Sequence, residues 1–306
     1  VAGLDGLKTS TMGIGKLLLD RRLTVPKYQR SYSWTTDEVL DLWNDLVRAL
    51  DENHHDYFLG TVVLSASSGE SDELDPGEEE VPSVIDGQQR LATISLLLVA
   101  IRDVFLAAGM AERVELVERF LIDRNEETLE LEPRLTLNEE NAEFFQETKL
   151  ARPSDRKNTQ PTVESQRRID KAFDLLVQKV EERKTENGAS WESDLVGLQT
   201  LIRTKAKVVI LDVPDEANAY LIFETLNDRG LDLTIADLLK NYLFSRAGAR
   251  KIDTVKQHWD RAMGALDPGE DDKLTTTFLR HYWSSKYGHT REKELYAKIK
   301  AEISSQ

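Results

Sequence analysis

The most constraining feature of this sequence is a short apolar run that ends in Asp-Gly and leads directly into a long apolar stretch. Val84–Asp86 is suited to a strand, and Gly87 allows a tight turn before the stretch 88–108 begins. Helical spacing places these apolar side chains on the inner side of the stretch: Leu91, Ile94, Leu97, Leu98, Ile101 and Phe105. The pattern therefore predicts an α/β unit with a long, largely buried helix.

Periodicity elsewhere predicts a helix-rich α/β fold. Strands are expected at 23–26, 57–65, 135–137 and 208–213. Helices are expected over 13–22, 35–50, 111–122, 138–148, 163–187, 191–204, 215–228, 235–246, 252–265, 272–286 and 290–303. We expect residues 1–150 to form an α/β core and residues 151–306 a mainly helical region that returns the strand 208–213 to it. The polar stretch 151–161 is the best candidate linker. The chain starts at Val and stops within a helical pattern, so we expect a fragment of a longer protein.

The charge of the chain is acidic and unevenly distributed. Asp and Glu number 55 against 40 Lys and Arg, which gives a net charge of −15. A protein that coats DNA without regard to sequence needs a basic surface, so this composition disfavours that class. Residues 66–83 hold seven of the acids and no base, together with glycines and prolines, and are expected to be a mobile acidic loop.

Several classes of site are excluded by what the sequence lacks. It has no cysteine, which rules out disulfides, thiolate zinc sites and thiol nucleophiles and fits a cytoplasmic protein. Its five histidines lack metal-ligand spacing, so no protein-built metal site is expected. No run of about 18 apolar residues occurs, so we expect no membrane span. The Gly-Lys-Ser/Thr pattern of a P-loop is also missing, so a nucleotide would have to bind in another way.

The Asp-Gly-Gln-Gln-Arg turn carries the first candidate site. Asp86 lies at the carboxyl end of a predicted strand, and after Gly87 the free N–H groups of a helix start form an anion site. Arg90 can pair with phosphate oxygens, and Gln88 or Gln89 can orient a water. Asp86 can hold Mg²⁺ or accept a proton. The alternative is an ordinary Asp-Gly turn before an exposed Gln-Gln-Arg.

A second segment alternates aromatic and basic side chains. Its candidate residues are Pro26, Lys27, Tyr28, Gln29, Arg30, Tyr32 and Trp34. Stacking faces interleaved with cations suit a flexible nucleic-acid or nucleotide ligand. In the alternative interpretation, Tyr32 and Trp34 are core anchors beneath a solvated Lys/Arg edge.

A third group of polar residues lies where two predicted helices meet. It consists of Asn227, Arg229, Lys240 and Asn241. Such corners can bind anions. The alternative is helix punctuation, because Gly230 resembles the residue that ends a helix, and Thr234 with Asp237 resembles a capping box.

Together and in this order, these segments resemble the N-terminal domain of GmrSD-type restriction enzymes and of SspE-type phosphorothioate-dependent defence proteins. The resemblance covers about residues 10–245. It rests on Pro26-x-Tyr28-Gln29-Arg30-x-Tyr32-x-Trp34, Phe58-Leu59-Gly60, Asp86-Gly87-Gln88-Gln89-Arg90, and Phe223-Glu224-x-Leu226-Asn227-x-Arg229-Gly230 followed by Asp237-Leu238-x-Lys240-Asn241.

The resemblance implies a ParB/sulfiredoxin-like core with helical additions. It implies hydrolysis of a nucleoside triphosphate, with GTP favoured and Mg²⁺ as a further ligand, to restrict modified, phosphorothioated DNA. The catalytic roles would fall to Asp86, Gln88, Gln89 and Arg90. Cofactor binding would fall to Gly87, Arg30, Asn227, Arg229, Lys240 and Asn241. Full-length relatives add a C-terminal nuclease domain, and no nuclease motif occurs in this sequence.

Two questions remain open at this point. The first is whether the chain is such an NTPase or a non-catalytic module that reads modified DNA or a protein partner. The second concerns geometry. The segment 26–34 could sense DNA separately while the Asp-Gly-Gln-Gln-Arg turn handles nucleotide, or Arg30 and Arg90 could lie on the same triphosphate in one pocket. No sequence pattern indicates the oligomeric state.

Overall fold

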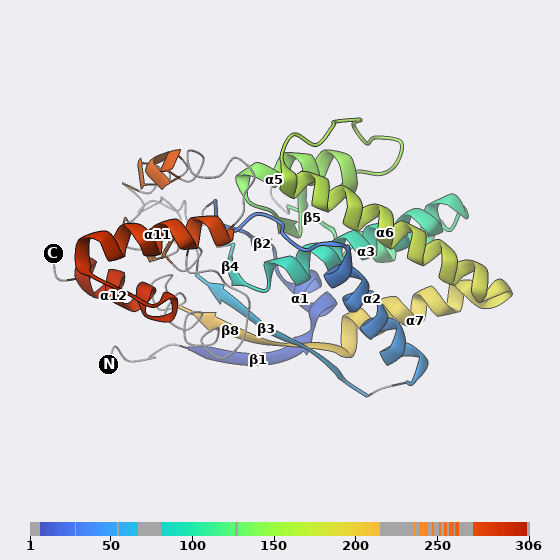
Figure 1. Ribbon diagram of the computed structural model, residues 1–306. Coiled ribbons are helices and arrows are strands. Elements are labelled where there is room, and N and C mark those ends of the chain that lie inside the picture. Colours follow the sequence, from blue (N-terminus) through green and yellow to red (C-terminus); the bar gives the residue numbers. More distant parts are fainter. Residues whose placement is uncertain are drawn as a thin grey trace. The chain divides into compact units, whose positions relative to one another are not determined.

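The structure is a computed structural model that describes residues 7–27, 29–53, 55–66, 81–125, 128–214 and 272–304, with some positions between 236 and 262 (Figure 1). The chain forms two compact units. The first contains residues 1–67 and 78–214, and the second contains residues 68–77 and 215–306.

A six-stranded mixed sheet forms the centre of the first unit. Its strands are β1 (Lys8–Gly13), β2 (Leu23–Thr24), β3 (Tyr57–Ser65), β4 (Ser83–Asp86), β7 (Leu135–Thr136) and β8 (Ala206–Val213), in the spatial order β1-β8-β3-β4-β2-β7. Strand β8 pairs antiparallel with β1 and parallel with β3, so a segment from far along the chain completes the sheet. A smaller two-stranded sheet consists of β5 (Ile122–Arg124) and β6 (Leu131–Pro133).

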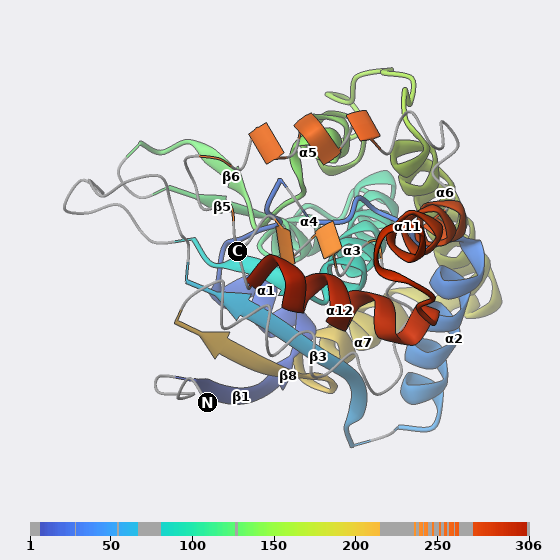
Figure 2. The ribbon, with the colours of Figure 1, turned by 60° about the vertical axis from the view of Figure 1, so that its left-hand side comes forward.

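Helices of the first unit pack against this sheet, and their sequence patterns explain their positions. They are α1 (Ile14–Asp20), α2 (Thr36–Asp51), α3 (Gln88–Ala107), α4 (Ala111–Glu118), α5 (Glu139–Phe145), α6 (Glu164–Glu186) and α7 (Trp191–Thr204), with a π-helical turn at Gln146–Leu150 and a 3₁₀ turn at Gly188–Ser190. Helix α2 begins with a capping box between Thr35 and Glu38, which satisfies N–H groups at its start. Helices α1 and α7 pack against β1 and β8, and Figure 2 shows them behind the strands.

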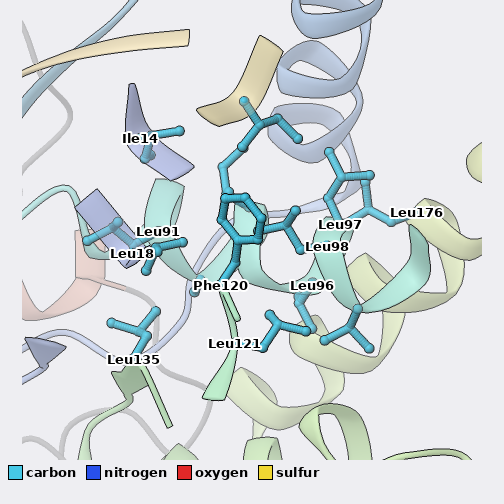
Figure 3. Packing of buried hydrophobic residues seen from close by; sticks show 14 of the residues in the cluster. Ile14, Leu18, Leu91, Leu96, Leu97, Leu98, Phe120, Leu121, Leu135 and Leu176 are labelled. Carbon is cyan, nitrogen blue, oxygen red and sulfur yellow. The ribbon is translucent and has the colours of Figure 1, made fainter. Parts of the chain in front are cut away.

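Helix α3 lies in the middle of the hydrophobic core. It is buried along nearly its whole length, including Leu91, Leu97 and Phe105. Figure 3 shows Leu91 near Leu18 of α1 and Leu97 near Leu176 of α6. A helix that is apolar on all sides requires such covering elements, and α4 and α6 make its most extensive helix contacts.

The structure confirms the mixed α/β class and the small mixed sheet with large helical additions. Strands β1, β5 and β6 were not expected, because short, partly exposed segments carry no apolar run. The stretch 151–161 is not the boundary between the two units, which lies after Pro214. The acidic loop and the predicted helix 215–228 fall outside the described residues. Among the helices described, none has both the length and the apolarity of a bilayer span.

The second unit contains α11 (Asp272–Tyr287) and α12 (Glu292–Ser304). These helices agree with the predicted ranges 272–286 and 290–303. They are joined by a short turn in which Thr290 is buried and accepts a hydrogen bond from Lys298 Nζ at 3.4 Å. Leu295 of α12 is fully buried.

Candidate functional site

Gly87 sets the geometry at the start of α3. Its φ of +93° lies in the left-handed region, where a side chain is unfavourable. A β-carbon there would also lie 2.9 Å from Cγ2 of Val62 on β3, so the turn can approach the neighbouring strand only with glycine. The turn leaves Asp86 at the end of β4 beside the first N–H groups of a twenty-residue helix.

Arg90 extends from the first turn of α3 onto β3. Its Nη1 donates to the carbonyl oxygens of Leu59 at 3.0 Å and Thr61 at 2.9 Å. Between these two carbonyls stands Gly60, where the pairing of β3 with β8 shifts register and φ is +107°. Nη2 of Arg90 lies 3.9 Å from Oδ2 of Asp86. The guanidinium side chain is only 17% exposed, so it is held by the protein and is not a freely solvated cation.

Burial raises the pKa of Asp86 above its ordinary value. The positive charge of Arg90 and a hydrogen bond from the backbone N–H of Gly87 act in the opposite direction but do not offset burial. A carboxyl group whose pKa is raised exchanges protons more readily near neutral pH than an exposed one. Asp86 therefore combines a position at a helix start with a perturbed pKa, a combination typical of functional sites.

Both glutamines of the turn bind the backbone of the aromatic–basic segment 26–34. Gln88 Nε2 donates to the carbonyl oxygen of Arg30 at 2.9 Å. Gln89 uses both ends of its amide: Nε2 donates to the carbonyl oxygen of Ser31 at 3.2 Å, and Oε1 accepts from the N–H of Ser33 at 2.9 Å. The first two candidate motifs are therefore joined in one structure by three hydrogen bonds.

The hydroxyl groups of Tyr32 and Thr93 also connect the segment 26–34 to α3. Thr93 Oγ1 lies 2.8 Å from the hydroxyl of Tyr32 and 2.8 Å from the carbonyl oxygen of Gln89. Because the single Thr93 hydroxyl proton goes to that carbonyl, the Tyr32 hydroxyl donates to Thr93. Tyr32 is 5% exposed, and Trp34 packs against the core. The structure thus favours the core-anchor interpretation of these two aromatics.

Two asparagines, Asn138 and Asn141, also hold the segment 26–34, and they were not predicted from the sequence. Asn138 Nδ2 donates to the carbonyl oxygen of Gln29 at 3.3 Å and to Ser31 Oγ at 3.0 Å, and its Oδ1 accepts from Asn141. Ser31 also donates to Glu140. Two asparagines three residues apart at a helix start were the available signal. Gln29 is buried, and among the described residues its Nε2 has no hydrogen-bond partner.

A small recess lies between the motifs. It is lined by Val25, Arg30, Tyr32, Gln88, Gln89, Ala92, Leu137, Asn138 and Asn141. Its volume of about 10 Å³ corresponds to roughly one water molecule. Sites for small organic ligands are typically about 300–1,000 Å³, so a nucleotide does not fit inside this recess as it stands.

The remaining predicted residues are placed as follows. Lys27 is exposed and Pro26 is half-buried at the edge of the segment. Lys240 is half-buried in the second unit. Tyr28, Asn227, Arg229 and Asn241 fall outside the described residues. Within the part of the chain that the structure describes, no three metal-ligating side chains come together.

Comparison with known proteins gives one family. The model of the GmrSD restriction endonuclease N-terminal domain matches residues 14–244. This range includes the turn at Asp86–Arg90, the segment 26–34 and Gly60. A search of curated proteins finds no match.

Proposed function

Because this chain belongs to the family of GmrSD restriction endonuclease N-terminal domains, it is a component of a restriction system, and we propose that it hydrolyses a nucleoside triphosphate in response to modified DNA. One observation carries the proposal beyond the family. Gln88 and Gln89 bind the backbone of residues 30–33, so the segment that carries Arg30 is held against the first turn of α3, from which Arg90 extends. This supports one shared phosphate-handling pocket.

In the proposed site, phosphate oxygens lie against the N–H groups at the start of α3 and the two arginines. Helix N-termini and guanidinium forks both favour anions, and their effects add where solvent is limited. Asp86 accepts the proton of the attacking water, a role consistent with its raised pKa. GTP is the favoured triphosphate by resemblance to the family.

The residues at the start of α3 could bind Mg²⁺ only together with the phosphates of a bound nucleotide. Among the described residues no three metal-ligating side chains come together, so Asp86 would share the ion with the phosphates, as is common for Mg²⁺ in nucleotide sites. The ion would neutralise phosphate charge there. Because the recess has room for about one water, the base and ribose lie outside it.

A second candidate function has its own observation. The amides of Gln88 and Gln89 and Nη1 of Arg90 are all used by backbone groups of the protein. A turn whose polar groups are internally satisfied suits a rigid scaffold. In that case the chain is a non-catalytic module that binds modified DNA or a protein partner.

Phosphate release separates the two functions. The purified chain is incubated with each of the four ribonucleoside triphosphates, with Mg²⁺, and with phosphorothioated or unmodified DNA of the same sequence. The NTPase proposal expects more phosphate release than an Arg90→Lys variant gives. Lysine keeps the positive charge but lacks the guanidinium group, which binds two carbonyl oxygens and, in the proposal, a phosphate. Release equal to that of the variant under all conditions would leave the binding module as the function.

A further inference from the structure

Helix α11 carries a row of exposed apolar and aromatic side chains. Leu274, Phe278 and Tyr282 are spaced by four residues and therefore lie on one side of the helix. They are 48%, 41% and 48% exposed, which is unusual for side chains of this size and type. Lys286 continues the row one turn further and is also exposed.

The rings of this row form a platform with a cation at its end. Phe278 and Tyr282 are near parallel, at 16°, with centroids 6.1 Å apart. Lys286 Nζ lies 4.6 Å from the centroid of Tyr282. A second stacked pair, Trp283 and Tyr287, has centroids 4.1 Å apart, and Tyr287 is 53% exposed. Flat rings with an adjacent ammonium group are chemically suited to bases and phosphates.

Between Asp272 and Glu292, the charge of the segment is opposite to that of the chain. Residues 273–291 contain four Lys or Arg and two His but no Asp or Glu, although the chain as a whole carries a net charge of −15. An acid-free basic segment in so acidic a protein attracts a polyanion. The positive charge therefore favours a polyanion as the ligand of this surface, because a purely apolar partner would not require it.

The exposed row is not needed to pack α11 on α12. The contact between these helices uses other positions: Arg280 pairs with Glu292 at 3.7 Å, and the N–H of Thr290 donates to Ser284 Oγ at 3.3 Å. Leu295 of α12 is fully buried. Substitutions in the row should therefore leave the helical pair folded.

We propose that this face of α11, with Phe278, Tyr282 and Lys286 at its centre, binds single-stranded nucleic acid. Bases stack on the two rings, and the phosphates between them lie against Lys286. Sequence is not read, because every base presents a stacking face. This surface is distinct from the site at the start of α3 and does not depend on nucleotide hydrolysis there.

The test is a binding measurement on the intact chain. Fluorescence anisotropy follows a labelled oligothymidylate of about 16 nucleotides, the upper end of site sizes for such proteins. The variants are Phe278→Ala with Tyr282→Ala, and separately Lys286→Glu. Matched controls are Leu131→Ala, which removes a side chain 65% exposed, and Lys157→Glu, which reverses a cation 63% exposed.

The proposal expects wild type and both controls to bind, and the aromatic variant to bind at least about tenfold more weakly, since one stacked base contributes roughly a factor of five to a hundred. Lys286→Glu should weaken binding and reduce its salt dependence. Phosphate release without DNA should stay at the wild-type level in every variant that melts at the wild-type temperature.

Three results would overturn the inference. Wild type could fail to bind the oligonucleotide. The aromatic variant could bind like the Leu131→Ala control. Alternatively, the variant could change the oligomeric state in gel filtration without changing DNA affinity, which would assign the row to a second copy of the chain. Failure of phosphate release alone would bear only on the α3 site.

Discussion

A β-carbon on Gly60 would lie 2.7 Å from Nη1 of Arg90, closer than two such atoms can approach. The glycine stands between the two carbonyls that Arg90 binds, at a register shift of β3. The strand therefore leaves a space that the guanidinium occupies. This makes Gly60 a positioning residue for Arg90 in the proposed phosphate site.

Gly60→Ala is expected to displace Arg90 and lower triphosphate hydrolysis nearly as far as Arg90→Lys does. Part of any stability loss comes from the positive φ, which costs a side chain roughly 1–2 kcal/mol. Gly109→Ala is the matched control, because Gly109 also has a positive φ of +72° but its β-carbon would meet nothing within 4 Å. Hydrolysis that falls equally in the two alanine variants would contradict the positioning role.

Gln89→Leu is expected to loosen the segment 29–34 by removing two hydrogen bonds to its backbone. Because these backbone groups are partly buried, leaving them unpaired costs at most the roughly 1–3 kcal/mol of a fully buried group. Hydrogen exchange of the amides in this segment should accelerate, most clearly at Ser33, whose N–H loses its acceptor. Gln88→Leu removes one bond and should have a smaller effect. Unchanged exchange at Ser33 would show that Gln89 does not hold the segment.

Asp86→Asn is expected to leave stability unchanged or raise it at neutral pH while abolishing hydrolysis. Burial raises the pKa of Asp86, so the folded state binds this proton more tightly than the unfolded chain. The contribution of Asp86 to the free energy of unfolding therefore falls as the pH rises. The fall begins at about pH 4, the pKa of aspartate in the unfolded chain, and continues through the higher pKa of Asp86 in the folded protein. Melting temperatures of variant and wild type should converge below about pH 4. A variant that is less stable at neutral pH would contradict this assignment.

Tyr32→Phe is expected to cost roughly 0.5–1.5 kcal/mol in unfolding free energy, the usual value of one buried hydrogen bond. The lost bond is that to Thr93. Because Tyr32 is buried, the response of hydrolysis to modified DNA should survive in this variant. Chemical denaturation and DNA-stimulated phosphate release measure the two effects. Loss of the DNA response at unchanged stability would assign the Tyr32 hydroxyl to DNA sensing.

The sequence was sufficient to predict the turn and the long buried helix, because a glycine between a β-branched strand and a twenty-residue apolar stretch permits few other structures. It also predicted β8 as a strand that returns to the sheet. It could not predict β1, which is six residues long and half exposed, and whose pairing partner is about two hundred residues away. Contacts between distant residues of this kind have no local signal.

The residues of the two motifs could be predicted from the sequence, but the position of one motif relative to the other could not. Either geometry, separate or shared, was consistent with their spacing. The hydrogen bonds from Gln88 and Gln89 to residues 30–33 join the two segments, and the proposal of a shared site rests on them. The support from Asn138 and Thr93 was not predicted, because short polar side chains at a helix start or within an apolar helix usually satisfy their own backbone.

The central claim is that Arg30 and Arg90 serve one phosphate site. The most direct test is the rate of basal phosphate release, without DNA, for Arg30→Ala and Arg90→Lys measured side by side. A charged hydrogen bond contributes roughly 1.5–3 kcal/mol, so each variant should lose about ten- to a hundredfold of the basal rate. If Arg30→Ala keeps the basal rate and loses only its stimulation by modified DNA, the two motifs form separate sites and the claim is wrong.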